Sequence, residues 1–137
     1  MKFMLILNSP RDGYAQYMKW PKAVLQANGE FMQAFSQRLK ASGELAGAAG
    51  LADPVRARRV RMGTDGRPVT DGVFPEAKEF LAGYWIVDVQ DEARALEIAA
   101  EASTAPGGTV LGADGKEEEH LWVEVRQVMG GRADLIE

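Results

Sequence analysis

The chain has 137 residues, of which 46% are hydrophobic and 26% are charged, and this composition is typical of a single globular domain spanning residues 1–137. It contains no cysteine, which excludes disulfide bonds, thiolate metal sites and a cysteine nucleophile. The formal net charge is −4, whereas general nucleic-acid binders are usually basic, so we expect no nucleic-acid partner.

The first predicted element is a β-strand over residues 2–8, in the apolar stretch KFMLILN. This stretch is too short for the apolar core of a signal peptide or for a membrane span. Together with the lack of cysteine, this favours a cytoplasmic protein that does not enter the membrane. Turn residues follow at Pro10 and Asp12-Gly13.

A long helix is predicted over residues 22–42. Phe31, Phe35 and Leu39 recur at every fourth position and mark its apolar face. Gly43 is well placed to end the helix in a left-handed conformation. The Asn28-Gly29 pair leaves open a division into two helices.

Two strands and a hairpin are expected next. A short Gly/Ala-rich strand ends before Pro54, residues 55–62 form a second strand, and residues 67–70 return as the other arm of a hairpin. We interpret the arginines of this region as solvated charges on an edge strand, with an anionic-ligand or protein-docking patch as the alternative. Alternation places Arg59 and Arg61 on one side of the strand, and Arg56 and Arg58 on the other.

The second half of the chain continues with a helix, a strand, a helix and a strand. Pro75 begins a short helix that ends at Gly83, because proline suits a first helical position. Residues 84–89 form a strand, and Asp91 caps the following helix. A loop or hairpin precedes the last strand, residues 121–128, and the tail 129–137 is either poorly ordered or part of an interface. The inner face of the second long helix is predicted to carry Leu96, Ala99, Ala100 and Ser103.

This order of elements predicts an α+β fold of the ferredoxin-like βαββαβ type, with an inserted hairpin and short helix. Strands 2–8 and 84–89 should be central, and the arginine-rich strand and the last strand should be edges. Both central strands are apolar on both faces, since Phe3 and Leu5 alternate with Met4 and Ile6. Two helices cover only one face, so we expect a second copy of the chain to cover the other in a homodimer.

A specific motif leads from the hairpin into the strand 84–89. It reads Thr70-Asp71-Gly72-Val73-Phe74, then Glu76, Lys78 and Glu79, then Ala82-Gly83 and Tyr84-Trp85. This pattern resembles the signature of the YCII-related family, in particular the branch named for Asp-Gly-Pro-Phe. Val73 stands where that branch has proline, and Ala82 where it has the first of two glycines. Flanking segments agree, so the resemblance covers nearly the whole chain except residues 110–120 and the tail.

The resemblance implies a dimeric α+β barrel. Some members are encoded beside sigma factors of the extracytoplasmic-function type, which implies a regulatory role. Distant relatives use a His–Asp pair, with the histidine on the first long helix. That pair does not carry over, because the helix predicted over residues 22–42 has no histidine.

Two interpretations of the candidate site residues stand side by side. In one, Asp71 stabilises a turn, while Lys78 and His120 are solvated surface charges. In the other, Asp71 and either Lys78 or His120 transfer protons, and a buried Asp71–Lys78 pair positions a small ligand in a cleft. No motif indicates a cofactor, and one histidine without cysteine disfavours a zinc site. The residues expected to contact the ligand are Asp71, Phe74, Lys78, Tyr84, Arg61 and Trp122.

Two functions therefore stay open. The first is a homodimer that binds a small molecule without catalysis, with a possible place in a sigma-factor circuit. The second is a small lyase or isomerase that acts on an aromatic or dicarbonyl compound.

Overall fold

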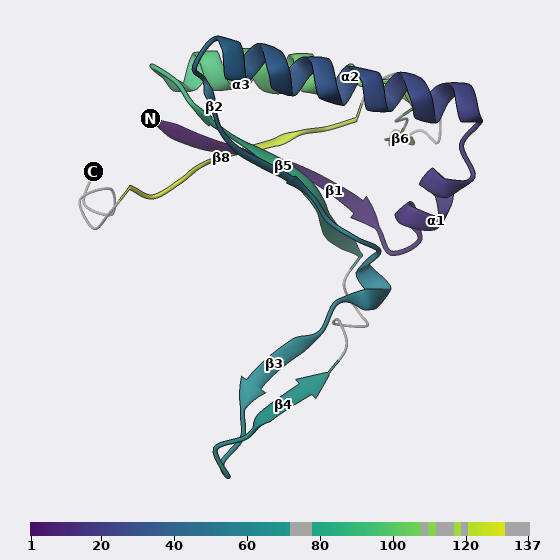
Figure 1. Ribbon diagram of the computed structural model, residues 1–137, viewed down its shortest axis with the longest axis vertical. Helices are drawn as coiled ribbons and strands as arrows, with labels where there is room; N and C mark the ends of the chain where they lie inside the picture. The colour runs from purple at the N-terminus through teal and green to yellow at the C-terminus, as the bar shows by residue number, and fades with distance from the viewer. Residues whose placement is uncertain (72–77, 108–109, 112–116, 119–120, 131–137) are drawn as a thin grey trace.

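The fold is built on one four-stranded sheet with two long helices against one of its faces (Figure 1). The computed structural model describes residues 1–71, 78–107, 110–111, 117–118 and 121–130. Together with the order of its elements, this arrangement confirms an α+β fold of the ferredoxin-like kind.

The sheet has the strand order β2-β5-β1-β8, and every neighbouring pair is antiparallel. The two apolar strands are central, as predicted. One predicted edge was wrong: the Gly/Ala-rich strand occupies it, while the arginine-rich segment belongs to a separate two-stranded sheet. The strands are β1 (Lys2–Pro10), β2 (Leu45–Gly50), β5 (Glu79–Asp88) and β8 (Glu124–Gln127).

Small residues let the edge strand β2 approach β5 closely. Gly83 lies inside β5, where an added Cβ atom would be 2.9 Å from the carbonyl oxygen of Ala49. Gly83 therefore does not end a helix, as had been predicted, but keeps two strands in contact.

The helix α2 (Lys22–Ala41) runs unbroken through Asn28-Gly29, so the predicted long helix is confirmed as one element. It ends before Gly43, whose φ of 79° is the left-handed conformation expected of a terminating glycine. A shorter helix, α1 (Gly13–Met18), was not predicted, because Asp12-Gly13 was read only as a turn.

The helix α3 (Glu92–Ala102) packs beside α2 on the same face of the sheet (Figure 1). Its predicted inner face was wrong except for Ala99: Leu96 is 51% exposed, Ala100 is exposed and Ser103 is partly exposed. Instead, α3 buries a face made mostly of alanine, because these small side chains let the helix pack closely around one large residue, Ile98. The buried residues of α3 are Ala95, Ile98, Ala99 and Ala102.

The hydrophobic core lies between these helices and the sheet. Phe35 stands edge-on to Trp85, with ring centroids 5.1 Å apart, and joins α2 to β5. Leu5, Val87 and Ile98 are fully buried. The other buried core members are Phe3, Leu39, Val89, Ala95, Ala99 and Ala102.

The arginine-rich segment begins as a short helical turn, not as a strand. The turn η1 (Pro54–Arg56) is stabilised by the Asp53 carboxylate, which accepts a hydrogen bond from the Val55 amide at 3.1 Å. The strand predicted over residues 55–62 therefore starts only at β3 (Arg59–Met62). It pairs with β4 (Pro68–Asp71) as the predicted hairpin.

The short helix predicted from Pro75 is contradicted where it can be compared. Residues 79–81 lie in β5, where Phe80 pairs with Ser9 and Leu81 with Asn8 of β1. Pairing with a distant strand outweighs the local helical tendency of this segment. The first three residues of the predicted helix, 75–77, lie outside the described residues.

The region after α3 contains the predicted hairpin in minimal form, with β6 (Val110–Leu111) antiparallel to β7 (Glu117–Glu118). Residues 112–116 between these two strands lie outside the described residues, as do residues 131–137 of the tail. The last strand is shorter than predicted. Within the described chain, no helix combines the length and the apolar character that a membrane crossing requires.

Candidate functional site

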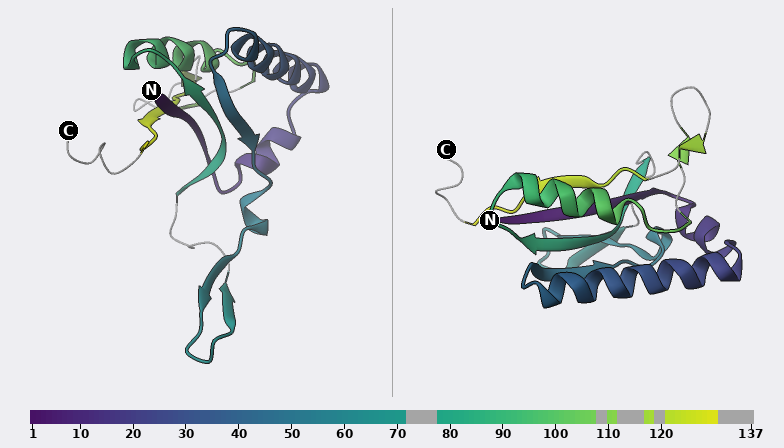
Figure 2. Two further views of the ribbon diagram at one scale, coloured as in Figure 1. Left: turned by 60° about the vertical axis from the view of Figure 1, so that its left-hand side comes forward. Right: turned by 90° about the horizontal axis from the view of Figure 1, so that it is seen from above.

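The first candidate surface is the face of the sheet opposite the one on which α2 and α3 pack (Figure 2). The strand register defines what lies on it, because residues opposite one another in an antiparallel pair share a face. Ile6 of β1 lies opposite Tyr84 of β5, and Met4 lies opposite Ile86. All four side chains are partly exposed. We call this surface the open face.

The two edges of the open face differ in chemistry. On the β2 edge, Gly47 lies opposite Ile86 and Ala49 lies opposite Tyr84. On the β8 edge, Glu124 lies opposite Ile6 and Arg126 opposite Met4. The open face therefore has a bulky apolar centre, a low border of small residues on one side, and a border of two opposite charges on the other.

A second candidate surface is the hairpin, which extends away from the sheet (Figure 1). We call residues 54–71 the arm. Arg59 pairs with Asp71 through a nitrogen–oxygen distance of 2.9 Å, and Arg61 lies opposite Val69 on the same face. A depression of about 250 Å³ runs along the middle of the arm. It is lined by Arg59, Val60, Arg61, Val69, Thr70 and Asp71.

The predicted site residues fall into separate groups in this geometry. Arg61 and Asp71 come together in the depression on the arm, whereas Tyr84 lies on the open face. Trp122 is 83% exposed and precedes β8. Arg61 and Asp71 thus share one depression, and neither Tyr84 nor Trp122 lines it.

The second interpretation of the candidate residues predicted that Asp71 and Lys78 form a buried pair. This is wrong in the structure, because both residues are exposed, and Asp71 forms an ion pair with Arg59 in the next strand. The hairpin register explains the difference, since it places Arg59 directly opposite Asp71. Phe74 and His120 lie outside the described residues.

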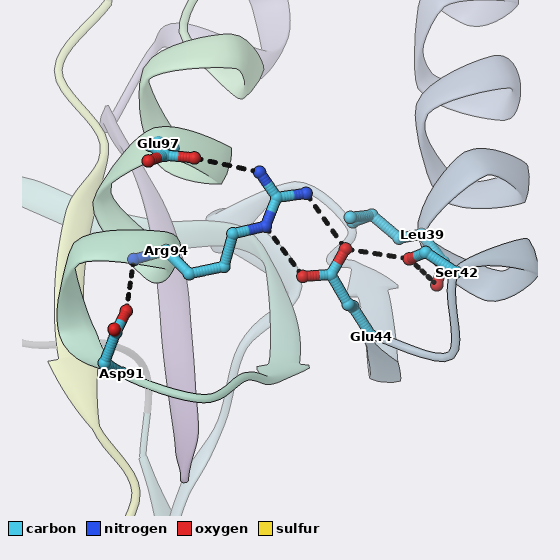
Figure 3. Close-up of polar contacts among 6 residues, drawn as sticks. All are labelled: Leu39, Ser42, Glu44, Asp91, Arg94 and Glu97. Atoms are coloured by element: carbon cyan, nitrogen blue, oxygen red, sulfur yellow. Dashed lines mark hydrogen bonds and ion pairs between the residues drawn. The ribbon is translucent and has the colours of Figure 1, made fainter.

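The sequence did not predict the charged cluster that has the largest pKa shifts among the described residues (Figure 3). The guanidinium of Arg94 donates two hydrogen bonds to the Glu44 carboxylate, at 2.8 and 3.0 Å. The Ser42 hydroxyl donates another to Glu44 at 2.8 Å, and Glu97 accepts a bond from Arg94 at 3.1 Å. These bonds join the loop after α2 to α3, and no local motif could show it, because Glu44 and Arg94 are far apart in the chain.

These contacts shift the pKa values of Glu44 and Arg94. The Arg94 hydrogen bonds, with help from Ser42, lower the pKa of Glu44 from 4.5 to about 2. The same bonds to Glu44 and then Glu97 raise the pKa of Arg94 above its usual value. Because each charge is already satisfied by the other, we assign this cluster to holding the helix layer on the sheet, not to chemistry.

In the parts of the chain that the structure describes, no three His, Cys, Asp or Glu side chains come together as a metal ion would require.

Comparison with known proteins gives one family. The family model of the YCII-related domain matches residues 1–117, which include the whole sheet except β8, all three α-helices and the arm. No curated protein matches the chain.

Proposed function

This chain belongs to the YCII-related domain family, and we propose that it acts as a homodimer that binds a small molecule in a cleft formed between two sheets. The open face is the observation that supports this proposal. It presents Met4, Ile6, Tyr84 and Ile86 side by side on the two central strands. Full burial of an exposed large apolar side chain contributes roughly 1.5–3 kcal/mol. These four side chains are partly exposed, so each gains a part of this stabilisation when the open face is covered.

A second copy is the simplest cover, because a two-fold interface places the same patch on both sides. The charged border suits this symmetry. Glu124 and Arg126 have opposite charges and lie two residues apart on β8. A two-fold axis that brings two β8 strands near each other pairs the carboxylate of one protomer with the guanidinium of the other.

The uneven height of the open face supports a ligand cleft. The centre is bulky, whereas the β2 edge carries only Gly47 and Ala49. Two such faces that meet at their centres leave space over the low borders, and Tyr84 stands next to that border with its hydroxyl group. An apolar hollow with a few polar groups is the usual form of a small-molecule site.

Sedimentation of the purified protein tests the dimer. We expect a dimer at micromolar concentration, and Ile6→Asp should convert it to a folded monomer because it buries an unpaired charge in the interface. Leu96→Asp is the matched control, since Leu96 is an exposed aliphatic residue on α3, outside the open face. A wild-type protein that sediments as a monomer would contradict the proposal.

Ligand binding is tested separately by a thermal-shift screen with small aromatic acids and dicarbonyl compounds. A ligand that binds only the folded state raises the melting temperature with concentration. We expect Tyr84→Phe to weaken this shift without changing the dimer. The ligand proposal fails if no compound of either class shifts the melting temperature of the wild-type dimer.

Membership of the Asp-Gly-Pro-Phe branch and a regulatory role beside a sigma factor extend the same proposal. They rest on the motif at residues 70–74, in which Val73 replaces the proline. A role in the cytoplasm is part of the same extension. Copurification of a sigma factor with the tagged protein from its native cells tests the regulatory role.

A lyase or isomerase activity is the second candidate. The depression on the arm favours it, because Asp71 and Arg61 both line it. Turnover of a dicarbonyl compound that is lost in Asp71→Asn, and retained in Asp65→Asn at the tip of the arm, supports this candidate. Binding without turnover by the wild-type protein rejects it.

A further inference from the structure

We infer that the arm is a docking surface for a second copy of this chain, so that each protomer clasps its partner from outside the sheet. The inference rests on the proposed dimer and names an additional part of its interface. Four observations support it: the two faces of the arm, its position, its charge and its length.

In its paired strands β3 and β4 the arm is a two-faced ribbon, and one face of these strands carries no charge. The register places Val60 opposite Thr70 and Met62 opposite Pro68, so these four residues share a face. Val60 is 62% exposed and Met62 is 68% exposed. We call this the uncharged face of the arm. The other face carries Arg59, Arg61, Val69 and Asp71.

A ribbon of this kind is poorly stable when it stands alone. Two-stranded hairpins without a covering layer are marginally stable in water, and β3 and β4 form a sheet of only these two strands. The turn itself is well built, since the Gly63 amide donates to the Arg67 carbonyl at 2.7 Å and the Asp65 carboxylate accepts from the Arg67 amide at 3.0 Å. The sequence thus favours the hairpin, while among the described residues Val60 and Met62 on its uncharged face stay exposed.

The position of the arm points to a copy of this chain as the cover. The arm extends away from α2 and α3, on the side of the sheet that carries the open face (Figures 1 and 2). A partner seated on the open face therefore lies beside the arm. The arm and the open face then form one continuous contact surface.

Charge favours the same partner. Five arginines and two aspartates give the arm a formal charge of +3, so the rest of a chain whose total is −4 carries −7. The arm of one protomer is attracted to the acidic body of another. Complementary charge of this kind orients partners as they meet and is weakened by salt.

The arm is also long enough. The strand β3 has four residues, so at about 3.3 Å per residue it spans roughly 13 Å, which exceeds the roughly 10 Å between two stacked sheets. An arm that projects from the open side therefore reaches past the interface and alongside the partner's sheet.

The dissociation constant of the dimer tests the inference. In the double variant Val60→Thr and Met62→Gln, both side chains keep nearly their size but become polar, so the hairpin is retained. We expect the dissociation constant to rise at least tenfold. Val69→Thr is the matched control, because Val69 lies on the other face of the same arm, and it should change the constant less than twofold.

A direct measurement uses the absence of cysteine in the natural chain. A photoreactive label on Met62→Cys should crosslink the two protomers on irradiation, and the same label on Lys22→Cys, at the start of α2, should not. If the wild type is a dimer but the double variant dimerises equally well and the Met62→Cys label gives no crosslinked dimer, the arm does not dock, while the proposed dimer stands. A monomeric wild type overturns both.

Discussion

The two faces of the central sheet are made of the same two strands, yet they differ in what covers them. Leu5 and Ile6 are neighbours in β1. Leu5 is fully buried under the helix layer, whereas Ile6 lies on the open face and is partly exposed. The two side chains have the same volume and hydrophobicity. Their different burial therefore reflects what packs above each face, not what the residues prefer, and this is why we propose a partner for the open face.

The pair Leu5→Ala and Ile6→Ala measures this difference directly and gives the largest expected effect. Leu5→Ala leaves a cavity in a closed core and should lower the free energy of unfolding by about 2–5 kcal/mol at any protein concentration. Ile6→Ala should cost about 1 kcal/mol or less in dilute protein and more where the dimer forms. Urea unfolding at two protein concentrations, a hundredfold apart, separates the two cases.

The comparison between the faces breaks down if the cost of Ile6→Ala does not change with protein concentration. Such a result means that the open face is not an interface. A cost for Ile6→Ala as large as that of Leu5→Ala in dilute protein means that part of the same chain covers Ile6.

Much of this fold could be predicted from the sequence, because it follows from local patterns. The long helix was predicted from Phe31, Phe35 and Leu39, and its end from Gly43, where only a residue tolerant of positive φ fits. The central strands were predicted from their two apolar faces. Two of the errors fall where pairing with a distant strand decides the outcome: Phe80 pairs with Ser9 of β1, and Gly83 allows the close contact of β5 with Ala49.

The candidate site was harder to predict than the fold. A motif shows which residues are close in sequence, but Asp71 and Tyr84 end up on different sheets. The charged border with Glu124 and the small border with Ala49 lie on opposite edges of one sheet, and only the strand order places them there. The bond between Glu44 and Arg94 depends on two helices packing side by side, and neither residue stands in a recognisable pattern.

Burial of the covered face depends on the contacts that hold α2 and α3 in place. The substitution Glu44→Gln tests one of them, the ion pair between Glu44 and Arg94. The pKa of Glu44 is lowered in the folded protein to about 2 from 4.5. A lowered folded-state pKa stabilises the protein above the unfolded-state pKa, and this stabilisation is lost as pH falls from about 4.5 to about 2. We expect Glu44→Gln to cost about 1–2 kcal/mol at pH 7, allowing for solvent around the Arg94 side chain, which is 42% exposed.

Chemical denaturation as a function of pH checks this prediction. The difference between the wild type and Glu44→Gln should shrink below pH 4.5 and vanish near pH 2. Glu97→Gln is the control, because its carboxylate is 68% exposed and its loss should cost less. A difference that is constant from pH 7 to pH 2 would show that the ion pair does not attach the helix layer.

The smallest effect is expected at the start of α3, where Asp91 sets the position of the same arginine. The Asp91 carboxylate accepts a hydrogen bond from the Arg94 amide at 2.9 Å (Figure 3). Asp91→Ala removes this cap and should cost about 1 kcal/mol, whereas Asp91→Ser keeps a capping oxygen and should cost much less. The cap holds the backbone of Arg94 while Glu44 holds its side chain, so Asp91→Ala should also reduce the cost of Glu44→Gln, which a double-mutant cycle measures. Strictly additive costs would mean that the cap stabilises α3 alone and plays no part in fastening the helix layer over the buried face.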